Sequence, residues 1–421
     1  MMSTDFKTEV EELGKKARLA SRKLASLSTL KKNKALEAIA DAILESKEEI
    51  KEANRLDLAE AENNGLSSAM IDRLTLTESR IEDMAKGLVM LAGLTDPVGK
   101  IDAEFIRPNG LSIEKTRVPI GVIGIIYESR PNVTVDAAGL CLKAGNAVIL
   151  RGGKEAIYSN RKLAEIMRAS GTEAGLPDDF VQLIPWTDRE AVNYLLRLDQ
   201  YINLIIPRGG EGLIRFTVEN ATIPVIKHYK GVCHVYVDAE ADMDMAKDII
   251  INGKCQRPGV CNAVESVLIH KDIAAQFAPL IATELNAKGV ELRGDSQFCQ
   301  LVPNASQATE QDWYEEYLEL ILSLKIVEDI DEAITHIADY GSSHSDAIVT
   351  GDKMAAQKFK NEVDSSAVYV NASTRFTDGS MFGMGAEIGI STDRLHARGP
   401  MGLEELTTYK YVVSGTGQIR E

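Results

Sequence analysis

The first quarter of the chain has the hydrophobic spacing of amphipathic helices. Within residues 4–95, apolar side chains recur at spacings of three and four, as in KKNKALEAIADAILESKEEIKEANRLDLAEA. That spacing places them on one helical face, and Ala, Leu, Glu and Lys, which dominate here, are strong helix formers. We therefore expect the chain to begin with a layer of helices.

The pattern changes in the segment FIRPNGLSIEKTRVPIGVIGIIYESR. Pro108, Asn109 and Gly110 form a turn signal between two extended segments. A run of apolar, β-prone residues follows from Val118 to Tyr127. The sequence predicts a hairpin followed by a buried strand.

Beyond this strand, short apolar runs alternate with helical patterns. The expected strands cover residues 147–150, 181–184, 201–206 and 224–226, and the expected helices cover 156–169, 189–198 and a segment opening near Glu211. A second set begins with the strand at 234–238 and continues through a helix at 271–288, the segment 311–337 and the strands and helix of 346–370. Such alternation predicts βαβ units on parallel sheets.

These two sets suggest two α/β domains, with a boundary near residue 230. The tail from Leu406, TTYKYVVSGTGQIRE, is β-prone. We expect it to pair with the edge strand of another subunit.

Charge and hydropathy narrow the range of partners. The chain has 47 Lys and Arg against 63 Asp and Glu, a net charge of −16, which disfavours nucleic acid and anionic membranes. No run approaches the roughly 18 apolar residues of a membrane span, and MMSTDFKTEVEELGKKARLA lacks the apolar core of a signal peptide. We expect a cytoplasmic protein with no nucleic-acid or membrane partner.

The cysteines argue against a disulfide framework and against a metal site. The chain has Cys141, Cys233, Cys255, Cys261 and Cys299. They are few and scattered, and no Cys-x-x-Cys or Cys/His cluster suits zinc. A reduced thiol with a chemical role remains open.

The segment QRPGVCNAVESVLIH presents one of these thiols on a turn. Cys261 follows a Pro-Gly pair and precedes a β run. A thiol on a turn can reach a ligand, and nearby backbone N–H groups can stabilise an oxyanion on a carbonyl that it attacks. Taken alone, the segment fits a buried structural cysteine equally well. Cys255 has a weaker case because no glycine turn presents it.

Two glycine-containing loops have the features of a nucleotide site. One strand ends in Arg151, Gly152, Gly153 and Lys154; basic groups at the carboxyl end of a parallel strand lie where nucleotides bind. The two cations suit a dinucleotide with an extra ribose phosphate, although a solvated strand end is equally compatible.

The second loop leads into a predicted helix, whose N-terminus favours anions. It contains Arg208, Gly209, Gly210 and Gly212. This loop is not a GxGxxG motif, so by itself it is weak evidence.

Taken together and in order, several segments resemble the aldehyde dehydrogenase superfamily and, within it, the γ-glutamyl phosphate reductase branch. They are VPIGVIGIIYESRPNVTVDAAGLCLKAGNAVILRGGKEA, IPRGGEGLI, KHYKGVCHVYVD, QRPGVCNA and HSDAIVTGD. The similarity spans nearly the whole chain. It implies an α/β fold with two Rossmann-like domains: residues 1–102 with 120–229 bind NADP, and 230–400 are catalytic. A small β oligomerisation element comprises 103–119 and 401–421.

The resemblance also implies roles for individual residues. Cys261 is the nucleophile, and Asn132 helps to hold the oxyanion. The NADP site is formed by Arg151, Gly152, Gly153, Lys154, Arg208, Gly209, Gly210 and Gly212. Glu316 matches the glutamate that holds the nicotinamide ribose, although its flanking residues differ.

One position departs from the wider superfamily. Hydrolytic members carry a water-activating Glu in an ELGGK-like segment, and counting back from 235–238 puts His228 at that position. A water-activating glutamate is not needed if phosphate, which is already an anion, takes the place of water in the reaction with the thioester. His228 then contacts phosphate, or it is a structural histidine.

The implied reaction is NADPH-dependent reduction of L-glutamyl 5-phosphate to L-glutamate 5-semialdehyde, without a metal. Arg130, Arg257 and Arg375 are candidates for binding the substrate's anionic groups, and each also fits a surface position or a structural ion pair. Three alternatives are a hydrolytic aldehyde dehydrogenase, a cysteine acyltransferase that uses no nicotinamide, and a non-catalytic scaffold. A homo-oligomer and a complex with a glutamate kinase are the expected assemblies.

Overall fold

The computed structural model describes residues 6–420, which divide into two compact units. Unit 1 takes in the chain up to Lys227, the segment Gly383–Gly389 and the tail from Met401. Unit 2 comprises His228–Phe382 and Ile390–Pro400. Each unit contains a parallel sheet with helices, which confirms the predicted α/β class.

The expected helical layer forms the start of unit 1. Its helices are α1 (Phe6–Leu24), α2 (Thr29–Glu45), α3 (Lys47–Asn63), α4 (Ser68–Leu74) and α5 (Glu78–Gly93). The side chains of Ser28, Ser67 and Thr77 accept backbone N–H groups at the starts of α2, α4 and α5, and such N-caps satisfy otherwise unpaired donors. The helical prediction is confirmed, except that residues 4 and 5 lie outside the described part.

The sheet of unit 1 has the order β5-β4-β3-β6, and all its strands are parallel. The strands are β3 (Val122–Tyr127), β4 (Ala147–Arg151), β5 (Val181–Leu183) and β6 (Leu204–Arg208). The helices are α6 (Asn132–Lys143), η1 (Lys154–Ala156), α7 (Ile157–Glu173), α8 (Arg189–Leu195) and α9 (Glu211–Asn220). Two strand predictions were wrong in extent. Residues 201–203 belong to a turn, and 224–226 make only one bridge, between Ile205 and Val225.

The strand order creates a switch point in unit 1. The chain proceeds from β3 to β4 and β5 on one side, then returns through α8 so that β6 pairs with the other side of β3. In open parallel sheets, ligands bind outside the carboxyl ends of strands at such a reversal. The loops after β3, β4 and β6 follow these carboxyl ends, so they gather at one edge.

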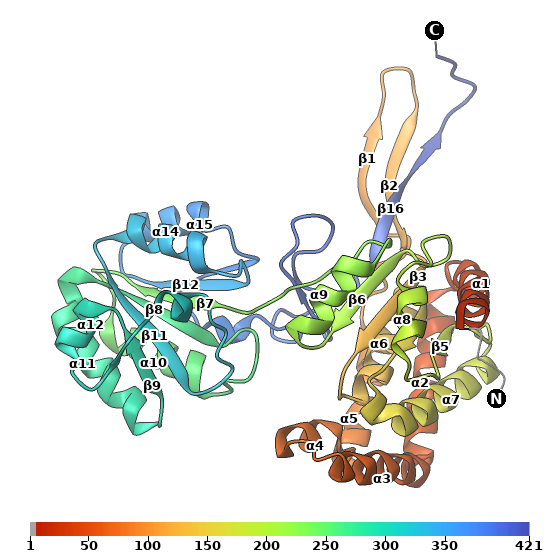
Figure 1. Cartoon of the computed structure of the whole chain (residues 1–421). Coiled ribbons are helices and arrows are strands. Elements are labelled where there is room, and N and C mark those ends of the chain that lie inside the picture. Colours follow the sequence, from red (N-terminus) through yellow and green to blue (C-terminus); the bar gives the residue numbers. More distant parts are fainter. Residues whose placement is uncertain (1–5, 421) are drawn as a thin grey trace. The chain divides into compact units, whose positions relative to one another are not determined.

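A separate antiparallel sheet combines β1 (Ile101–Ile106), β2 (Ser112–Pro119) and β16 (Thr407–Ser414), which lie side by side in Figure 1. The tail was expected to pair with another subunit. Within its own chain it pairs along β2, from Thr407 opposite Pro119 to Ser414 opposite Ser112. Because β16 is the edge strand of this sheet in the described residues, pairing of its other edge with another subunit stays a prediction. Pairing within the chain satisfies this edge of β2 without a partner molecule. The sheet still exposes apolar side chains, including Tyr411 at 57%.

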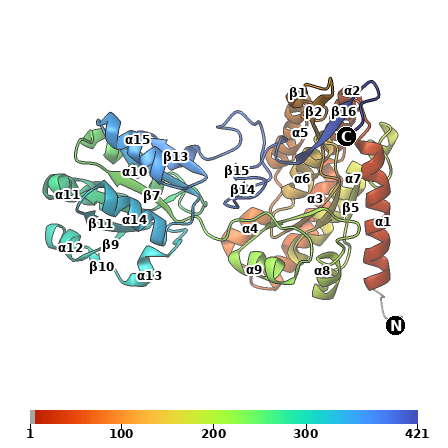
Figure 2. The ribbon, with the colours of Figure 1, turned by 90° about the horizontal axis from the view of Figure 1, so that it is seen from above.

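Unit 2 is built on a seven-stranded parallel sheet of order β10-β9-β11-β8-β7-β12-β13. Its strands are β7 (Cys233–Val237), β8 (Val264–His270), β9 (Glu291–Gly294), β10 (Ser306–Gln307), β11 (Ile321–Val327), β12 (Ser345–Val349) and β13 (Ala367–Val370). Its helices are α10 (Met243–Cys255), α11 (Lys271–Ala287), α12 (Ser296–Leu301), α13 (Glu310–Trp313), α14 (Ile330–Tyr340), α15 (Lys353–Glu362) and η2 (Thr374–Phe376). The short strands β14 (Ile390–Ser391) and β15 (Gly399–Pro400) pair with each other. Helices α11 and α12 lie side by side (Figure 1, Figure 2).

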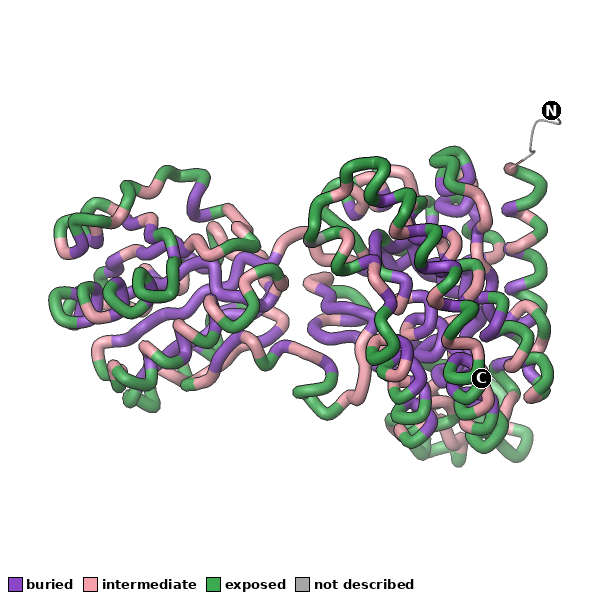
Figure 3. Tube along the Cα trace, turned by 90° about the horizontal axis from the view of Figure 1, so that it is seen from below, coloured by how far each residue is buried: buried purple, intermediate pink, exposed green. Residues whose placement is uncertain are grey.

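Alternating side chains of unit 2 form two apolar cores. Val235 and Val237 of β7 pack in the core that also contains residues of α10 and α11, whereas Tyr236 packs with residues of α14 and α15. Successive side chains of a strand point to opposite faces, so the central strands are buried on both sides. Figure 3 shows this continuous burial, and it explains why the sequence reads as unbroken apolar runs.

Candidate active site

The carboxyl edge of the unit 1 sheet brings together the predicted glycine loops. The Glu128 side chain follows β3 and accepts the backbone N–H of Gly210, before α9, at 2.9 Å. A Cβ at Gly209 would lie 2.3 Å from the Glu128 carboxylate, and one at Gly152 would lie 2.0 Å from the Asn160 amide. At both glycines a Cβ would displace a neighbouring side chain that contacts the backbone in this structure.

The two cations predicted for this edge have different surroundings. The Arg151 guanidinium donates to the carbonyls of Gly152 and Thr187, both at 3.0 Å. Burial lowers the pKa of Arg151, while the charges of Glu155 and Glu128 raise it. Lys154 is exposed at the start of η1. Arg151 therefore shapes the loop, and Lys154 presents its charge to solvent.

The loop between β3 and α6 contains Arg130 and leads to Asn132. Ser129 has a φ of 45°, a strained value for a residue other than glycine, and it donates to the Glu155 carboxylate from its backbone N–H and its hydroxyl. The Asn132 amide donates to Asp136 at 2.8 Å. Burial raises the pKa of Asp136 to about 6, although the Asn132 hydrogen bond and the charge of Arg208 lower it.

Cys261 belongs to unit 2 and lies at the amino edge of its sheet, not at a carboxyl edge. It belongs to a turn in which Ala263 N–H donates to the Val260 carbonyl at 3.0 Å, immediately before β8. The residue is half-buried. The thiol is therefore presented at the amino ends of the parallel strands.

Neighbouring residues support the backbone of this turn. Cys233, at the start of β7, donates from its thiol to the Cys261 carbonyl at 3.3 Å. A Cβ on Gly231 would lie 2.0 Å from the same carbonyl oxygen. The segment leading into β7 is therefore in direct contact with the backbone of Cys261. Burial, followed by the charge of Asp346, raises the pKa of Cys233 well above its ordinary value, so this thiol stays protonated.

Two imidazoles lie at the same amino edge. The rings of His228 and His344 have centroids 5.8 Å apart. The Nδ1 atom of His344 is 3.7 Å from the Cys233 sulfur and 2.9 Å from the Ser345 hydroxyl. Burial, with a smaller effect of His228, lowers the pKa of His344 to about 3. His344 is therefore neutral at pH 7.

The predicted arginines of unit 2 flank the cysteine turn. The Arg375 guanidinium donates to the side-chain oxygens of Gln256, at 3.0 Å, and of Asn262. Arg257 is exposed and has no hydrogen bond or ion pair within residues 6–420. The two charges interact, because Arg257 lowers the pKa of Arg375 after the larger effect of burial.

Glu316 lies in the loop between α13 and β11, which also reaches this edge. The backbone N–H of Leu318, two residues on, donates to Glu265 at 3.3 Å, and Glu265 forms a fully buried pair with Lys254 at 2.5 Å. Burial raises the pKa of Glu265 to about 7, and Glu316 adds to that rise. Glu316 is thus close to Glu265, which lies in β8 just after the cysteine turn.

The predicted site residues therefore form two groups. Asn132, Arg130 and the glycine loops belong to unit 1, whereas Cys261, His228, Glu316, Arg257 and Arg375 belong to unit 2. The sequence did not identify Gly231, Cys233, His344 or Asn262 as supports of the turn that contains Cys261. Only the positions of Gly231, just before a β run, and of Asn262, beside the cysteine, offered a signal.

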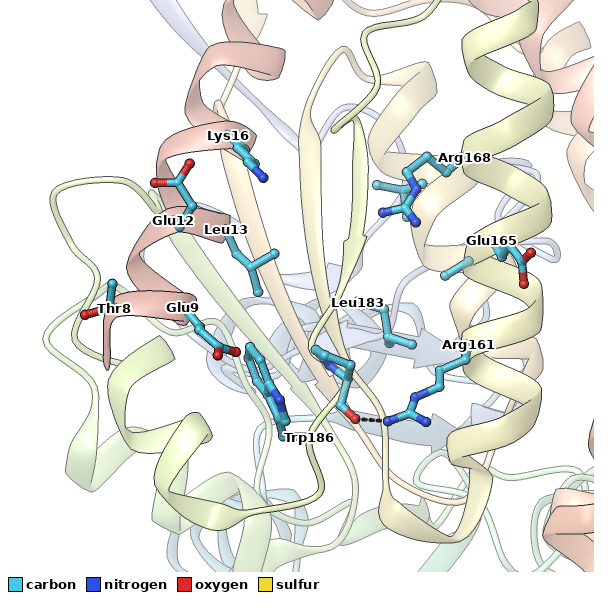
Figure 4. A pocket seen from close by; sticks show the side chains of 13 residues that line it. Thr8, Glu9, Glu12, Leu13, Lys16, Arg161, Glu165, Arg168, Leu183 and Trp186 are labelled. Carbon is cyan, nitrogen blue, oxygen red and sulfur yellow. Dashed lines mark hydrogen bonds between the residues drawn. The ribbon is translucent and has the colours of Figure 1, made fainter. Parts of the chain in front are cut away.

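A groove elsewhere in unit 1 contains none of the predicted residues. It has a volume of about 660 Å³ and lies between α1, α7 and β5, beside Trp186 (Figure 4). Its charged side chains are Lys16, Arg161 and Arg168 with Glu9, Glu12 and Glu165. The signs balance, so the groove has no excess positive charge with which to select an anionic cofactor.

The described residues contain no membrane-spanning helix, metal-ligand group or disulfide. Within residues 6–420, no helix is long and apolar enough to cross a membrane. In the same described part, no three or more His, Cys, Asp or Glu side chains are grouped so that they could hold a metal ion. The five cysteines, all described, form no disulfide.

Comparison with known families identifies the class of protein. The model of the aldehyde dehydrogenase family matches residues 2–320. The chain therefore belongs to the aldehyde dehydrogenase family, whose members use a nicotinamide cofactor.

Individual relatives narrow the comparison. The chain is 58% identical over 413 residues to gamma-glutamyl phosphate reductase of Caldanaerobacter subterraneus subsp. tengcongensis, covering 98% of this chain and 100% of the relative. The enzyme of the same name from Moorella thermoacetica is also 58% identical, with 98% and 99% covered. The crystal structure of gamma-glutamyl phosphate reductase from Thermotoga maritima has a TM-score of 0.97 at 50% identity, with 98% and 100% covered. An acetylating aldehyde dehydrogenase from Geobacillus thermoglucosidasius shares the fold, with a TM-score of 0.68 at 17% identity and both chains covered fully.

The carboxyl edge of unit 1 fits a nicotinamide dinucleotide. It has the switch point between β3 and β6, glycine positions where the backbone is approached closely, and the exposed cation Lys154. The Nε atom of Arg151 is also buried there without a hydrogen-bond partner within residues 6–420. A bound group that presents acceptor oxygens would satisfy such donors.

Proposed function

We propose that this chain catalyses the NADPH-dependent reduction of L-glutamyl 5-phosphate to L-glutamate 5-semialdehyde, with release of phosphate, in proline biosynthesis. The observation that carries the proposal is the turn that presents Cys261 at the amino edge of unit 2, flanked by cationic side chains. The names of relatives that match the whole chain support the same substrate.

Cys261 acts as the nucleophile. Its thiolate attacks the acyl carbon of the acyl phosphate, a carbon–sulfur bond forms, and the bond to the phosphate oxygen breaks. The backbone N–H of Cys261 and the side-chain amide of Asn132 hold the oxyanion of the tetrahedral intermediate. Phosphate leaves as an anion, and the enzyme carries a thioester.

The nicotinamide cofactor, when bound, supplies the hydride that reduces the thioester carbon. The resulting thiohemiacetal collapses, which releases the aldehyde and returns the sulfur of Cys261 to the thiolate. Glu316 would hold the nicotinamide ribose. The chain's own residues thus orient the reacting carbon, stabilise the oxyanion and regenerate the nucleophile.

His228 replaces the carboxylate that activates water in hydrolytic relatives. Without that base, the thioester is protected from water and remains available to hydride or, in the reverse direction, to phosphate. A histidine near the reaction centre can also donate a hydrogen bond to phosphate. We assign this role to His228, with its ring against that of the neutral His344.

The preference for NADP rests on Lys154. The group is cationic and exposed at the carboxyl edge of β4, where an adenosine 2′-phosphate would find a charge-assisted hydrogen bond. Arg151 supports the loop through its bonds to Gly152 and Thr187, and the loop from Arg208 to Gly212 contacts the rest of the dinucleotide.

We place the enzyme in the cytoplasm as a homo-oligomer. The β1-β2-β16 sheet exposes apolar side chains, including Phe105 at 49% and Val413 at 56%, and such sheets associate readily. Because an acyl phosphate hydrolyses in water, a complex with the glutamate kinase that makes it is a further proposal. Co-purification of the two proteins tests it.

The reaction is tested in reverse with glutamate 5-semialdehyde and NADP. We expect reduction of NADP to require inorganic phosphate and to saturate with it. Equal turnover without phosphate would favour a hydrolytic aldehyde dehydrogenase, and absence of any nicotinamide binding would favour a cysteine acyltransferase.

A further inference from the structure

The two guanidinium groups beside Cys261 have unlike surroundings, although both lie in motif loops. Arg375, in η2, is half-buried and engaged with other side chains, whereas Arg257, in the loop after α10, is exposed. Because their contacts differ, the two arginines have different roles beside Cys261. The contacts of each decide which role it takes.

Arg375 bridges the two ends of the cysteine turn. Its Nε atom donates to Gln256, the residue that ends α10, at 3.0 Å, and its Nη1 atom donates to the side chain of Asn262, which follows Cys261. The segment between these acceptors is Arg257–Cys261. A single rigid fork therefore fixes the separation of the turn's two ends.

Further bonds hold Asn262 in place for this contact. The Asn262 amide donates to the Thr377 carbonyl at 2.8 Å, and the Thr374 hydroxyl donates to the Asn262 carbonyl at 2.7 Å. Thr374 and Asn262 are both buried. The η2 segment and the cysteine turn are thus tied together by side-chain bonds on both sides of Arg375.

Arg257 has the opposite character. Within residues 6–420 it makes no hydrogen bond or ion pair, and its side chain is exposed beside the Pro258–Gly259 turn. Its positive charge lowers the pKa of Arg375, after the larger effect of burial. An anion bound beside Arg257 would relieve this repulsion between two cations, and its five N–H donors are available for that anion.

We infer that Arg375 is a positioning residue that holds the Cys261 turn, and that Arg257 is the residue that contacts the phosphate group of the acyl phosphate. This assignment rests on the proposed function, because it takes an acyl phosphate as the substrate. It gives different roles to Arg257 and Arg375, which the sequence predicts equally as binders of the substrate's anionic groups.

Kinetics in the reverse direction, with semialdehyde, NADP and inorganic phosphate, test the assignment. Arg257→Gln should raise the KM for phosphate by at least about tenfold with a much smaller change in kcat, and Arg257→Lys should recover most of this loss because a point charge still binds phosphate. Arg375→Lys should lower kcat by at least about tenfold and leave the phosphate KM nearly unchanged, because an ammonium cannot span both acceptors.

A second readout does not depend on turnover. Iodoacetamide alkylates the Cys261 thiolate, and peptide mass analysis follows that site apart from the other four cysteines. Phosphate should slow alkylation of the wild type and of Arg375→Lys at similar concentrations, but should no longer protect Arg257→Gln. Arg375→Lys should instead change the alkylation rate without phosphate by several-fold.

Gln256→Ala removes only one of the two acceptors that Arg375 bridges. Gln256 is exposed, so its loss should not prevent folding. It should shift kcat in the same direction as Arg375→Lys, and by less. The inference is overturned if Arg257→Gln keeps the wild-type phosphate KM and protection, or if Arg375→Lys and Gln256→Ala both match the wild type in kcat and alkylation. If the wild type does not oxidise the semialdehyde, the proposed function fails, while the alkylation series still decides the two roles.

Discussion

The two units place their functional residues at opposite edges of similar parallel sheets. In unit 1, the loops follow β3, β4 and β6, so the site gathers at the carboxyl edge; in unit 2, Cys261 precedes β8 and lies at the amino edge. Strand order by itself brings the unit 1 loops together. No such rule applies to the amino edge, so the cysteine turn depends on individual side-chain contacts.

The two edges also differ in their charged contacts. In unit 1, the carboxylates of Glu128 and Glu155 accept backbone N–H groups of Gly210 and Ser129. In unit 2, the contacts around the turn come from a thiol donor and a guanidinium donor, Cys233 and Arg375. A change in one supporting side chain should therefore affect the cysteine turn more than the dinucleotide loops.

Among variants that keep the Cys261 thiol, the largest effect is expected from Gly231→Ala. The new Cβ would lie 2.0 Å from the Cys261 carbonyl oxygen, so the nucleophile's backbone must move. A displacement of about 1 Å can lower kcat by roughly 10²-fold. Gly259→Ala is the matched control in the same loop, because its Cβ would approach nothing closer than the Leu318 carbonyl at 3.6 Å. Equal kcat values for the two variants would contradict the described support of the turn.

The next effect concerns unit 1. Lys154→Ala should weaken NADPH binding by about 10- to 100-fold, the value of one charge-assisted hydrogen bond, and leave NADH binding nearly unchanged. Fluorescence titration of the two cofactors measures both dissociation constants. Lys162→Ala removes the same charge from α7, where the lysine pairs with Glu49, and should change neither. Loss of NADH and NADPH binding in equal measure would show that Lys154 does not read the 2′-phosphate.

A buried imidazole should make unit 2 sensitive to acid. Burial, followed by the charges of His234 and Lys325, lowers the pKa of His336 to about 2. Because the unfolded pKa is near 6.5, the native state holds His336 neutral. Its contribution to stability is complete above that pH and falls by about 1.4 kcal/mol per unit as pH decreases below it.

His336→Phe keeps an aromatic ring beside Trp313 and Tyr340 but cannot be protonated. Urea unfolding between pH 7 and pH 5 should therefore show a shallower loss of stability for this variant than for the wild type. Parallel curves would mean that the pKa of His336 is the same in the folded and the unfolded protein.

Asp136 should give unit 1 a smaller response of the opposite sign. Its folded pKa of about 6 exceeds the ordinary value near 4. The protonated carboxyl therefore stabilises the fold at low pH, and this contribution, about 3 kcal/mol, is lost as pH rises through about 6.

Asp136→Asn should remove this dependence. The difference in stability between wild type and variant should grow as pH rises from 4 to 6, and urea unfolding over that range measures this change. The exposed Asp83, paired with Lys86, supplies Asp83→Asn as a control with a wild-type profile. A constant difference between wild type and Asp136→Asn across this range would contradict the raised pKa.

Much of the fold was predictable because its signals are local. The periodicity of 4–95, the buried strand at 122–127 and the basic strand end at Arg151 all lie within short windows. The supports of Cys261 were not predictable, because the pairing of β7 with β8 and the placement of η2 bring Cys233 and Arg375 to the turn. The pairing of the tail with β2 depends likewise on contacts between distant segments.

In the proposed mechanism, Cys261 forms the thioester and phosphate, not water, accepts the acyl group. The most direct measurement is NADP reduction with glutamate 5-semialdehyde, with and without phosphate, for the wild type, Cys261→Ser and Cys255→Ser. We predict phosphate-dependent turnover that Cys255→Ser retains and Cys261→Ser lowers by about 10³-fold or more. Full activity of Cys261→Ser, or wild-type turnover that is the same without phosphate, would contradict the account.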